Sequence, residues 1–373
     1  MSKKILIIMG TRPEAIKLTP LYLELKEQGF DVMLLSTGQH STMLDQVLNF
    51  FQIKPDIFLV IERKTHSLSE LTSQLFLKLD EVMINERPDL VIVQGDTTSA
   101  FVGAMCAFYN KILLAHVEAG LRTHDKSIPF PEEVNRTIIG DVADFHFAPT
   151  KQAAMNLTSL KMENIFVTGN TIVDALLLGK SQIEKNVKHY NSKFSGIVNE
   201  NQRNILITGH RRESFGAGFE QICNAINEIA TNYNNYNFIY PVHLNSQVRE
   251  VVKSRLGNTA NIYLLDPLDY DDLLFVMSNC TLILTDSGGI QEEAPSFNIP
   301  VIIMRDNTER QEGIESGCAI LAGVKKESIM STFKALMSDK DLYNKMVNSS
   351  NPYGNGTASI QIVSIIRNQI LRS

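Results

Sequence analysis

The chain has 373 residues, of which 44% are hydrophobic, so it is long enough for two domains of ordinary size. Its 35 basic and 41 acidic residues give a net charge of −6, which argues against a nucleic-acid-binding protein, because such proteins usually carry a basic excess. No run approaches the ~18 apolar residues of a membrane span, so we expect no membrane insertion. The apolar start, residues 3–9, passes into Gly10 without a small-residue cleavage site, and it predicts a buried strand rather than a signal peptide.

The cysteines and histidines predict neither a metal site nor a disulfide framework. The cysteines lie far apart without a C-x-x-C pair, and the histidines form no H-E-x-x-H motif. We therefore expect reduced, mostly structural thiols in a cytoplasmic protein without a metal ion. The cysteines are Cys106, Cys223, Cys280 and Cys318.

The first half of the chain alternates apolar, β-rich runs with amphipathic helical segments. This rhythm is typical of a doubly wound parallel sheet, whose strands are apolar throughout because helices cover both faces. The predicted elements are strand 4–9, helix 15–28, strand 31–36, helix 68–85, strand 89–94, helix 97–109, strand 112–117 and strand 145–148.

The same rhythm restarts after Val167 and predicts a second α/β domain. We place the boundary near residue 170, with domains 1–170 and 171–356, and expect a final helix at 357–371 to pack back on the first domain. Two halves of similar length imply a cleft between them in which ligands bind. The predicted elements are helix 171–178, strand 204–208, helix 219–233, strand 237–240, strand 262–265, helix 270–278, strand 281–285 and strand 301–304.

The turn after the first strand carries two cations. Ligands of parallel sheets bind beyond the carboxyl ends of the strands, so the residues there are candidates for a site. Gly10 permits a tight turn, and Pro13 suits the first position of a helix. Arg12 and Lys17 lie near that helix N-terminus, which itself favours anions, and they predict a phosphate-bearing ligand. The alternative is a solvated helix start with surface ion pairs.

Three acidic groups follow strands of the first half. Asp96 follows strand 89–94, Glu118 follows strand 112–117, and the pair Glu132 and Glu133 ends a proline-stiffened loop before a helix. Crowded carboxylates raise one another's pKa and so provide general acids and bases near neutral pH. Alternatively, each one is a helix cap or an ion-pair partner, and Asp96 in particular stands where a cap would be.

The second half begins with residues suited to an anion. His210, Arg211 and Arg212 follow the strand 204–208 directly, where a phosphate would be met. The G-x-G-x-x-G pattern is incomplete, because its sixth position is Gln221, and no P-loop motif occurs. We therefore exclude a dinucleotide site and a P-loop.

The most specific stretch is 284–295, where a strand runs through small residues into a helix. Ser287, Gly288 and Gly289 let backbone N–H groups approach a phosphate, assisted by the helix dipole. A carboxylate one turn into that helix, where Glu292 and Glu293 stand, can accept two hydrogen bonds from a ribose diol. The stretch 305–310, after the next strand, adds the cations Arg305 and Arg310 at the same edge. Ordinary helix capping by Ser287 is the alternative.

Eight ordered sequence blocks resemble the non-hydrolysing UDP-N-acetylglucosamine (UDP-GlcNAc) 2-epimerases. Together they extend over nearly the whole chain. The resemblance implies two Rossmann-like domains of the glycosyltransferase-B type, with the active site in the cleft between them, and usually a homodimer. It also implies interconversion of UDP-GlcNAc and UDP-N-acetylmannosamine (UDP-ManNAc) in the cytoplasm for surface polysaccharide synthesis. The blocks are GTRPEAIK (10–17), GDTT (95–98), HVEAGLRT (116–123), PEEVNR (131–136), GHRRES (209–214), PVHLN (241–245), TDSGGIQEEAPS (285–296) and RDNTER (305–310).

The resemblance also assigns roles to single residues. The catalytic positions that it implies are Asp96, Glu118 and Glu132 around the sugar, with His210 on the pyrophosphate side. The substrate-binding positions are Arg12 and Lys17 for sugar or phosphate, Ser287, Gly288 and Gly289 for phosphate, Glu293 for the ribose, and Arg310 for phosphate or sugar. Uracil is expected on the backbone near Leu268 and Leu273, where this chain departs from the polar and aromatic residues of some relatives.

The family reaction suits these residue types. A base removes the C2 proton while UDP leaves C1 to give a glycal, and UDP then adds back as the proton is delivered to the other face. This requires a base, an acid and cationic stabilisation of the departing UDP. Glu118 or Asp96 would handle the proton, and Arg12 with His210 would stabilise UDP. Neither a metal nor a cofactor is signalled.

Some bacterial relatives bind a second UDP-GlcNAc as an activator. Four residues here match positions associated with that site, but the stretch around Thr65 lacks an arginine that some regulated members carry. Activation therefore stays open. The four residues are Gln39, Gln46, Arg211 and His243.

Other functions are compatible with parts of this pattern. A hydrolysing epimerase would release UDP and free N-acetylmannosamine, and a variant would act on another UDP-2-acetamido sugar. A glycosyltransferase of the same fold would share the 284–295 stretch, and a non-catalytic sensor would bind the sugar nucleotide without proton exchange. The carboxylates of the first half favour the epimerase.

Overall fold

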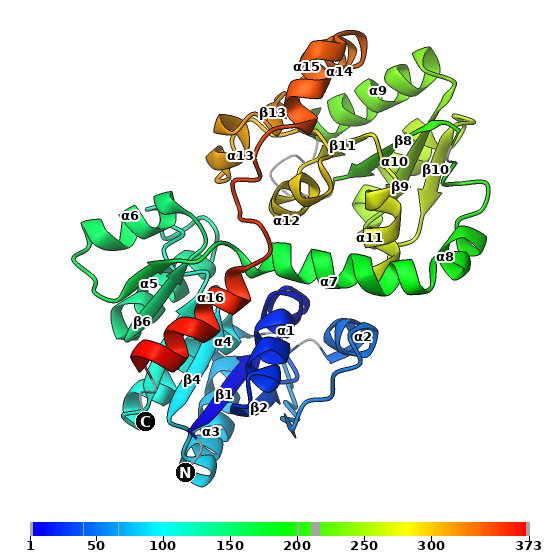
Figure 1. Cartoon of the computed structure of the whole chain (residues 1–373). Coiled ribbons are helices and arrows are strands. Elements are labelled where there is room, and N and C mark those ends of the chain that lie inside the picture. Colours follow the sequence, from blue (N-terminus) through cyan, green and yellow to red (C-terminus); the bar gives the residue numbers. More distant parts are fainter. Residues whose placement is uncertain (1–2, 40, 66, 200, 210–216, 371–373) are drawn as a thin grey trace. The chain divides into compact units, whose positions relative to one another are not determined.

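The computed structural model describes residues 3–39, 41–65, 67–199, 201–209 and 217–370. The chain forms two compact units: unit 1 comprises Met1–Leu178 with Tyr353–Ser373, and unit 2 comprises Gly179–Pro352. Within the described residues, each unit is built on one parallel sheet with helices packed around it (Figure 1). The predicted α/β class with two doubly wound sheets is therefore confirmed.

Unit 1 contains, in its described part, a seven-stranded sheet with the order β3-β2-β1-β4-β5-β6-β7 and parallel pairing throughout. The strands are β1 (Lys4–Met9), β2 (Asp31–Ser36), β3 (Ile57–Phe58), β4 (Leu90–Gln94), β5 (Leu113–Val117), β6 (Phe145–Ala148) and β7 (Ile165–Val167). The helices are α1 (Arg12–Glu27), α2 (Ser41–Phe50), α3 (Leu68–Glu86), α4 (Thr98–Tyr109), α5 (Glu132–Val142), α6 (Lys151–Ser159), α7 (Thr171–Lys185) and α16 (Ala358–Ile365), the last continued by a π-helical turn (Ile366–Ile370).

Strand β1 shows why these segments form a doubly covered sheet. All of its residues from Ile5 to Met9 are fully buried. Leu6 and Ile8 belong to the core formed with α3, α4 and α5, and strand side chains alternate, so Ile5 and Ile7 face the opposite layer. In α3, every fourth residue from Leu71 to Met83 is buried, which is the helical repeat that the sequence shows.

The strand order of unit 1 reverses between β1 and β4. From β1 the chain adds β2 and β3 on one side, and it then returns to place β4 and the later strands on the other. The turns after two such strands lead in opposite directions and leave room for a ligand at the carboxyl edge. In unit 1, these turns are residues 10–12 after β1 and residues 95–97 after β4.

Unit 2 contains, among the described residues, a six-stranded parallel sheet with the order β10-β9-β8-β11-β12-β13. The strands are β8 (Arg203–Thr208), β9 (Tyr236–Pro241), β10 (Ile262–Leu265), β11 (Leu282–Thr285), β12 (Val301–Ile303) and β13 (Ala319–Leu321). The helices are α8 (Val187–Lys193), α9 (Ala217–Asn232), α10 (Ser246–Leu256), α11 (Tyr270–Ser278), α12 (Gly288–Glu293), a 3₁₀ turn (Ala294–Phe297), α13 (Gln311–Glu315), α14 (Lys326–Ser338) and α15 (Lys340–Val347).

The core of unit 2 lies between its sheet and helices α9, α10 and α14. Ile205 and Ile207 of β8 and Phe238 of β9 pack there with Phe333 of α14. The strand order reverses between β8 and β11, so the segments after these two strands mark the ligand position of unit 2. The segment 210–216, which follows β8, lies outside the described residues.

The division between the units lies inside helix α7, whereas the sequence places a boundary near residue 170, where that helix begins. The first part of α7 holds the returning C-terminal segment. Asp174 of α7 accepts hydrogen bonds from the backbone N–H of Ser359 (2.8 Å) and Ala358 (3.3 Å) at the start of α16. Helix α16 lies against α1 (Figure 1), and Arg367 donates to the carbonyl of Gln28 at 2.8 Å.

Several elements were not predicted from the sequence. Helix α7 runs on to Lys185 and is followed by α8, although residues 185–202 contain few large apolar residues. In α8, Tyr190 is the buried residue, so local propensity and one aromatic anchor suffice there. The two-residue strand β3 is too short for any pattern to predict.

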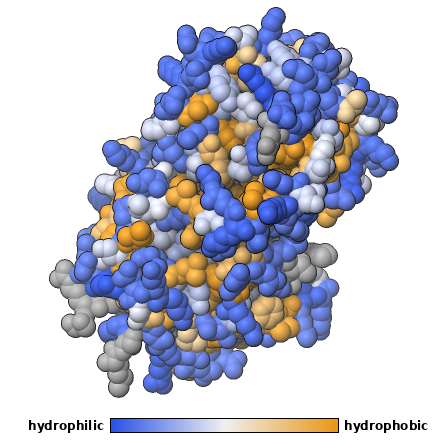
Figure 2. All heavy atoms as spheres, turned by 45° about the vertical axis from the view of Figure 1, so that its right-hand side comes forward, coloured by the Kyte–Doolittle hydropathy of each residue, from blue (hydrophilic) through white to orange (hydrophobic). Residues whose placement is uncertain are grey.

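Hydrophobic side chains remain exposed in patches between hydrophilic residues (Figure 2). Leu77 is 77% exposed, Phe130 70% and Tyr109 63%. Across the described ranges, every helix is too short or too polar to cross a membrane.

The buried cap on α16 yields a test of unit 1. Asp174 is 6% exposed, and burial raises the pKa of its carboxyl. Replacing Asp174 with alanine leaves two buried N–H groups without an acceptor, so we expect a loss of about 2 kcal/mol in the free energy of unfolding. Urea unfolding gives the stability, and hydrogen exchange should become faster in residues 358–365.

Asp339→Ala is the matched control. Asp339 accepts from the N–H of Asp341 and of Leu342, both at 2.9 Å, but it caps an exposed helix start where water replaces the lost acceptor. We expect a loss of about 1 kcal/mol or less. Equal losses for the two variants would contradict the role given to burial.

Candidate active site

The turn after β1 is packed against two hydroxyl groups. Thr37 Oγ1 and Ser99 Oγ are hydrogen-bonded at 2.8 Å, and a Cβ atom at Gly10 would lie 2.4 and 2.1 Å from them. Only glycine fits at this position. Arg12, the last residue of this turn and the first of α1, is half-buried and makes no hydrogen bond or ion pair within the described part of the chain.

Glu14 is fully buried in the first turn of α1 and connects two segments. Its Oε2 accepts hydrogen bonds from Gly10 N (3.1 Å) and Thr11 Oγ1 (2.8 Å), and its Oε1 accepts one from Thr97 Oγ1 (2.8 Å). Burial raises the pKa of Glu14 to about 7, although these hydrogen bonds oppose the shift. The carboxylate therefore joins the turn after β1 to the turn after β4.

Glu118, directly after β5, is held by a cation and an amide. Lys17 Nζ of α1 lies 2.5 Å from Glu118 Oε2, and Gln94 Nε2 donates to the same oxygen at 2.9 Å. The side chains of Lys17 and Glu118 are 11% and 8% exposed. The backbone of Glu118 is left-handed, with φ of 62°, so the strand ends abruptly at the carboxylate.

Asp96, after β4, is an ion-pair partner and not the helix cap. Its carboxylate pairs with Arg136 of α5, and its carbonyl accepts from Asn135 Nδ2 at 2.9 Å. The cap of α4 is Thr97, whose hydroxyl accepts from Ala100 N at 3.0 Å. The side chain of Asp96 is thus left at the sheet edge, 22% exposed.

His116 fixes the turn that carries Asp96. It is 1% exposed, and burial lowers its pKa to about 3, so the ring is neutral at physiological pH. Since the carbonyl of Gly95 can only accept, His116 Nε2 donates to it, at 2.7 Å. Gly95 has φ of 66°, a conformation that favours glycine.

The paired acids at the start of α5 have different environments. Glu133 is 4% exposed, accepts from the N–H of Thr123 (3.1 Å) and His124 (3.0 Å), and lies 3.4 Å from Arg136. Glu132 is the first residue of α5 and is half-buried. Glu133 thus orders the loop after β5, and Glu132 is left for other contacts.

Two of the three predicted carboxylates follow neighbouring strands. Gln94 of β4 and Val117 of β5 are register partners, so Asp96 and Glu118 emerge side by side at the carboxyl edge of the sheet. Each is paired with a cation: Glu118 with Lys17, and Asp96 with Arg136. An ionised carboxylate at a strand end can act as a base, and the adjacent cation stabilises negative charge on a ligand.

In unit 2, the residues after β8 and β11 flank the point where the strand order reverses. Thr208 Oγ1 and Thr285 Oγ1, on paired strands, are 2.5 Å apart, and Tyr240 donates to the carbonyl of Gly209 at 2.9 Å. The predicted residues His210 and Arg211 lie outside the described residues.

The Ser-Gly-Gly segment begins helix α12, and the guanidinium group of Arg310 packs against it. Ser287 is the N-cap residue but makes no side-chain cap bond, so the ordinary capping alternative is not what the structure has. A Cβ atom at Gly288 would lie 2.9 Å from Arg310 Cζ, so the guanidinium rests on this glycine. Gly289 is exposed, and Glu293, the last residue of α12, is 8% exposed.

Two carboxylates hold the Arg310 guanidinium. Arg310 Nε donates to Glu292 Oε1 at 3.0 Å, and a second guanidinium nitrogen lies 2.9 Å from the same oxygen. A third nitrogen pairs with Glu309, which also lies 3.1 Å from Arg305. The sequence predicts the arginine but not the acids that orient it.

The remaining predicted residues lie on loops and helix faces. Leu268 is half-buried between β10 and α11, and Leu273, in the first turns of α11, is also half-buried. In unit 1, Gln39 accepts from Ser99 Oγ at 2.6 Å, and Gln46 is exposed on α2. In unit 2, His243 is exposed and its Nδ1 accepts from Asn245 N at 3.2 Å.

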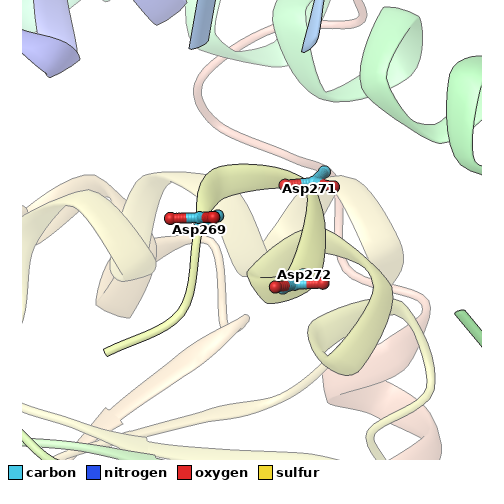
Figure 3. A group of neighbouring side chains, drawn as sticks. All are labelled: Asp269, Asp271 and Asp272. Carbon is cyan, nitrogen blue, oxygen red and sulfur yellow. The ribbon is translucent and has the colours of Figure 1, made fainter. Parts of the chain in front are cut away.

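Three aspartates cluster at the start of α11 (Figure 3), with one carboxylate oxygen of each within 4.8 Å of the others. Such a group is able to bind a cation, but two of its members already have partners. Asp271 accepts from Tyr190 at 2.9 Å, and Asp272 lies 2.6 Å from Lys193. These contacts attach α8 to α11 and account for both acids as structural anchors.

Sequence reasoning overlooked Glu14, Glu133 and Glu292. Glu14 follows a proline at a helix start, where an acid is ordinary, and nothing in the sequence indicates its full burial. Glu133 and Glu292 each adjoin a second glutamate, so the pattern does not distinguish the orienting acid from its neighbour. The signal available was the acid doublet itself.

Comparisons with known proteins agree with this arrangement. Residues 23–367 match the family described as UDP-N-acetylglucosamine 2-epimerase. The UDP-N-acetylglucosamine 2-epimerase of Campylobacter jejuni is 47% identical over 376 residues, covering 98% of each chain.

Solved structures extend the likeness to three dimensions. The UDP-GlcNAc 2-epimerase of Neisseria meningitidis, solved bound to UDP-GlcNAc, has a TM-score of 0.91 and 41% identity, covering 97% of this chain and 99% of that one. MurG of Acinetobacter baumannii is similar in fold alone, with a TM-score of 0.59 and 15% identity over 98% and 99% of the two chains. The match along nearly the whole chain, together with the acids and cations at the strand ends, identifies this protein as a member of the UDP-N-acetylglucosamine 2-epimerase family.

Proposed function

We propose that this protein interconverts UDP-GlcNAc and UDP-ManNAc without hydrolysis. The observation that carries the proposal is the pair of carboxylates, Asp96 and Glu118, that emerge from neighbouring strands and each pair with a cation. Membership of the family and the sugar nucleotide bound in the Neisseria meningitidis structure support the substrate.

The proposed reaction is an anti elimination followed by re-addition. A carboxylate takes the C2 proton, its electron pair forms the C1–C2 double bond, and the C1–O bond breaks with UDP as the leaving group. UDP then attacks C1 of the 2-acetamidoglucal as a proton is delivered to the other face of C2, which balances the reaction. Glu118 and Asp96 are the candidates for these proton transfers, and Glu132, at the start of α5, is the third catalytic candidate.

Charge on the departing UDP requires cations, and the chain offers them at strand ends. Arg12 follows β1 with no partner among the residues that the structure describes, so its guanidinium is available to a ligand. Arg310 rests on Gly288 at the start of α12, where backbone N–H groups and a guanidinium together suit a diphosphate. We assign Ser287 and Gly289 to the same phosphates, Glu293 to the ribose, and the backbone near Leu268 and Leu273 to uracil.

UDP-ManNAc, made in the cytoplasm, would be a precursor for surface polysaccharide synthesis. We also propose that the enzyme works as a homodimer. Four exposed apolar side chains on α3 and α4 support a self-association face: Leu77, Ile84, Phe108 and Tyr109. Tyr109 stacks on Phe76 of α3, with ring centroids 6.4 Å apart, so the two helices share this surface.

Activation by a second UDP-GlcNAc through Gln39, Gln46, Arg211 and His243 is testable as sigmoidal reverse kinetics.

Loss of either carboxylate should strongly slow proton exchange at C2. In deuterated buffer with UDP-GlcNAc and no acceptor, we expect the enzyme to form UDP-ManNAc with deuterium at C2. Asp96→Asn and Glu118→Gln should lower this exchange by roughly 10²–10⁴-fold, the usual contribution of a positioned acid or base. NMR of the products measures both isomer and label.

Asp31→Asn is the control. Asp31 is an exposed acid at the start of β2, and so at the edge of the sheet opposite to the one that bears Asp96 and Glu118. Full exchange in both active-site variants would refute the assignment. Free N-acetylmannosamine as the product would indicate the hydrolysing enzyme, and binding without exchange would indicate a sensor.

Gly288→Ala should weaken UDP binding. The new Cβ would displace the Arg310 guanidinium from its place over α12, so we expect the Kd for UDP to rise about tenfold, as for the loss of one hydrogen bond to a charged group. Gly103→Ala is matched, because its Cβ would lie 2.8 Å from Ile8 Cδ1 in the core of unit 1. That variant should lose stability and keep its affinity for UDP in calorimetry; equal losses of affinity would contradict the proposal.

Leu77→Glu should convert a dimer into a monomer, because it places a charge on the proposed face. Leu160→Glu, at a 50% exposed position after α6, is the control. Light scattering coupled to gel filtration gives the mass of each. A monomeric unmodified protein, or a dimer that tolerates Leu77→Glu, would contradict this face.

A further inference from the structure

Glu14 connects the two turns that flank the reversal of strand order in unit 1. Its Oε2 receives the N–H of Gly10 and the hydroxyl of Thr11 from the turn after β1, and its Oε1 receives the hydroxyl of Thr97 from the turn after β4. The three contacts are 2.8–3.1 Å long, and the side chain is fully buried.

These turns carry the groups that the proposed chemistry uses. Arg12 lies between the contact residues Thr11 and Glu14, and Asp96 directly precedes the contact residue Thr97. Their backbones are therefore linked through one side chain. By contrast, β1 and β4 pair through Ile5–Ile7 and Leu90–Ile92, and this pairing ends before either turn.

The donors define the charge state that the contacts favour. The Gly10 N–H can only donate, and the hydroxyls of Thr11 and Thr97 donate to Glu14, while Thr97 Oγ1 also accepts from Ala100 N. Three donors facing two oxygens suit an ionised carboxylate. Burial opposes ionisation, and the balance raises the pKa of Glu14 to about 7.

We propose that Glu14 is a positioning residue that fixes the turn bearing Arg12 against the turn bearing Asp96, so that the cation and the acid meet the substrate in a set geometry. The proposal rests on the function proposed above, because that function gives Arg12 and Asp96 their roles. A misplacement of a reacting group by about 1 Å costs on the order of 100-fold in rate. The hydrogen bonds by which Glu14 holds the two turns together are therefore sufficient to affect kcat.

Two substitutions separate the contacts from the charge. Glu14→Ala removes all three contacts, and we expect kcat to fall about 100-fold, with a much smaller rise in the Kd for UDP, because Arg12 is in unit 1 but the other groups assigned to UDP are in unit 2. Glu14→Gln can keep the contacts, with its oxygen toward Gly10 and Thr11 and its amide donating to Thr97 Oγ1. It should retain more activity than the alanine variant.

The pH profile provides a readout that a purely structural role would not move. The Gln variant should lack the change in kcat near pH 7 that ionisation of Glu14 produces. Charged groups at or beside these turns include Arg12, Lys17 with Glu118, and Asp96 with Arg136, and all of these are unchanged in this variant.

Thr97 tests the clamp from the other turn. Thr97→Val removes the hydroxyl and should lower kcat about tenfold, and Thr97→Ser should restore it. Thr150→Val is the matched control, because Thr150 caps α6 through Ala153 N at 3.1 Å in the same way but lies in another turn. Asp174→Asn controls for altering a buried carboxylate elsewhere in unit 1.

A folded Glu14→Ala enzyme with kcat within threefold of the unmodified value would overturn the proposal, as would losses of the same size in the Thr150 and Asp174 controls. If the alanine variant fails to fold, Thr97→Val and Thr97→Ser decide, and equal kcat in these two would overturn it. Failure of the proposed function itself is distinguishable, because the unmodified protein would then form no UDP-ManNAc.

Discussion

Strands buried on both faces confine polar chemistry to their ends. In unit 1, β1 is fully buried from Ile5 to Met9, and the first polar side chains with room around them come after Gly10. In β4 all residues are buried and the apolar run ends at Val93, and in β5 the residues from Leu114 to Val117 are buried before Glu118 follows. Parallel pairing collects these ends at one edge of the sheet, and Asp96 and Glu118, each with its cation, lie at that edge of unit 1.

The buried acids of the site act mainly on backbone and cations. Glu14 and Glu133 each accept from backbone N–H groups of a turn, and Glu292 holds Arg310. An ion that accepts several hydrogen bonds in a buried turn restricts that turn more than apolar packing does, because hydrogen bonds are directional. Asp96 and Glu132 are more exposed than these acids, and they lie in segments whose conformation other residues hold.

Much of this organisation was predictable because it is periodic. The apolar runs and four-residue helical repeats predict both sheets, and the polar residues after strands predict Asp96, Glu118 and Arg310 at the carboxyl edges. What the sequence cannot provide is partner choice. Whether Asp96 caps a helix or pairs with Arg136 depends on how α5 packs, 40 residues along the chain. The full burial of Glu14 likewise depends on Thr97, which reaches it only after β1 and β4 pair.

The charge of Glu14 lowers the free energy of unfolding, so it does not stabilise the fold. We infer that this charge instead orders the two turns that bear Arg12 and Asp96. An unfolded chain ionises glutamate near pH 4.5, whereas in the folded protein burial raises the pKa of Glu14 to about 7. Between these values the folded state retains a proton that the unfolded state has released, so stability falls as pH rises through this window. Above about pH 7 the full effect is present, on the order of 3 kcal/mol. Glutamine could keep contacts with the same three groups, with the hydrogen bond to Thr97 reversed, and would not carry this loss. The fold alone therefore does not explain the acid, and the electrostatics of the turns that bear Arg12 and Asp96 do.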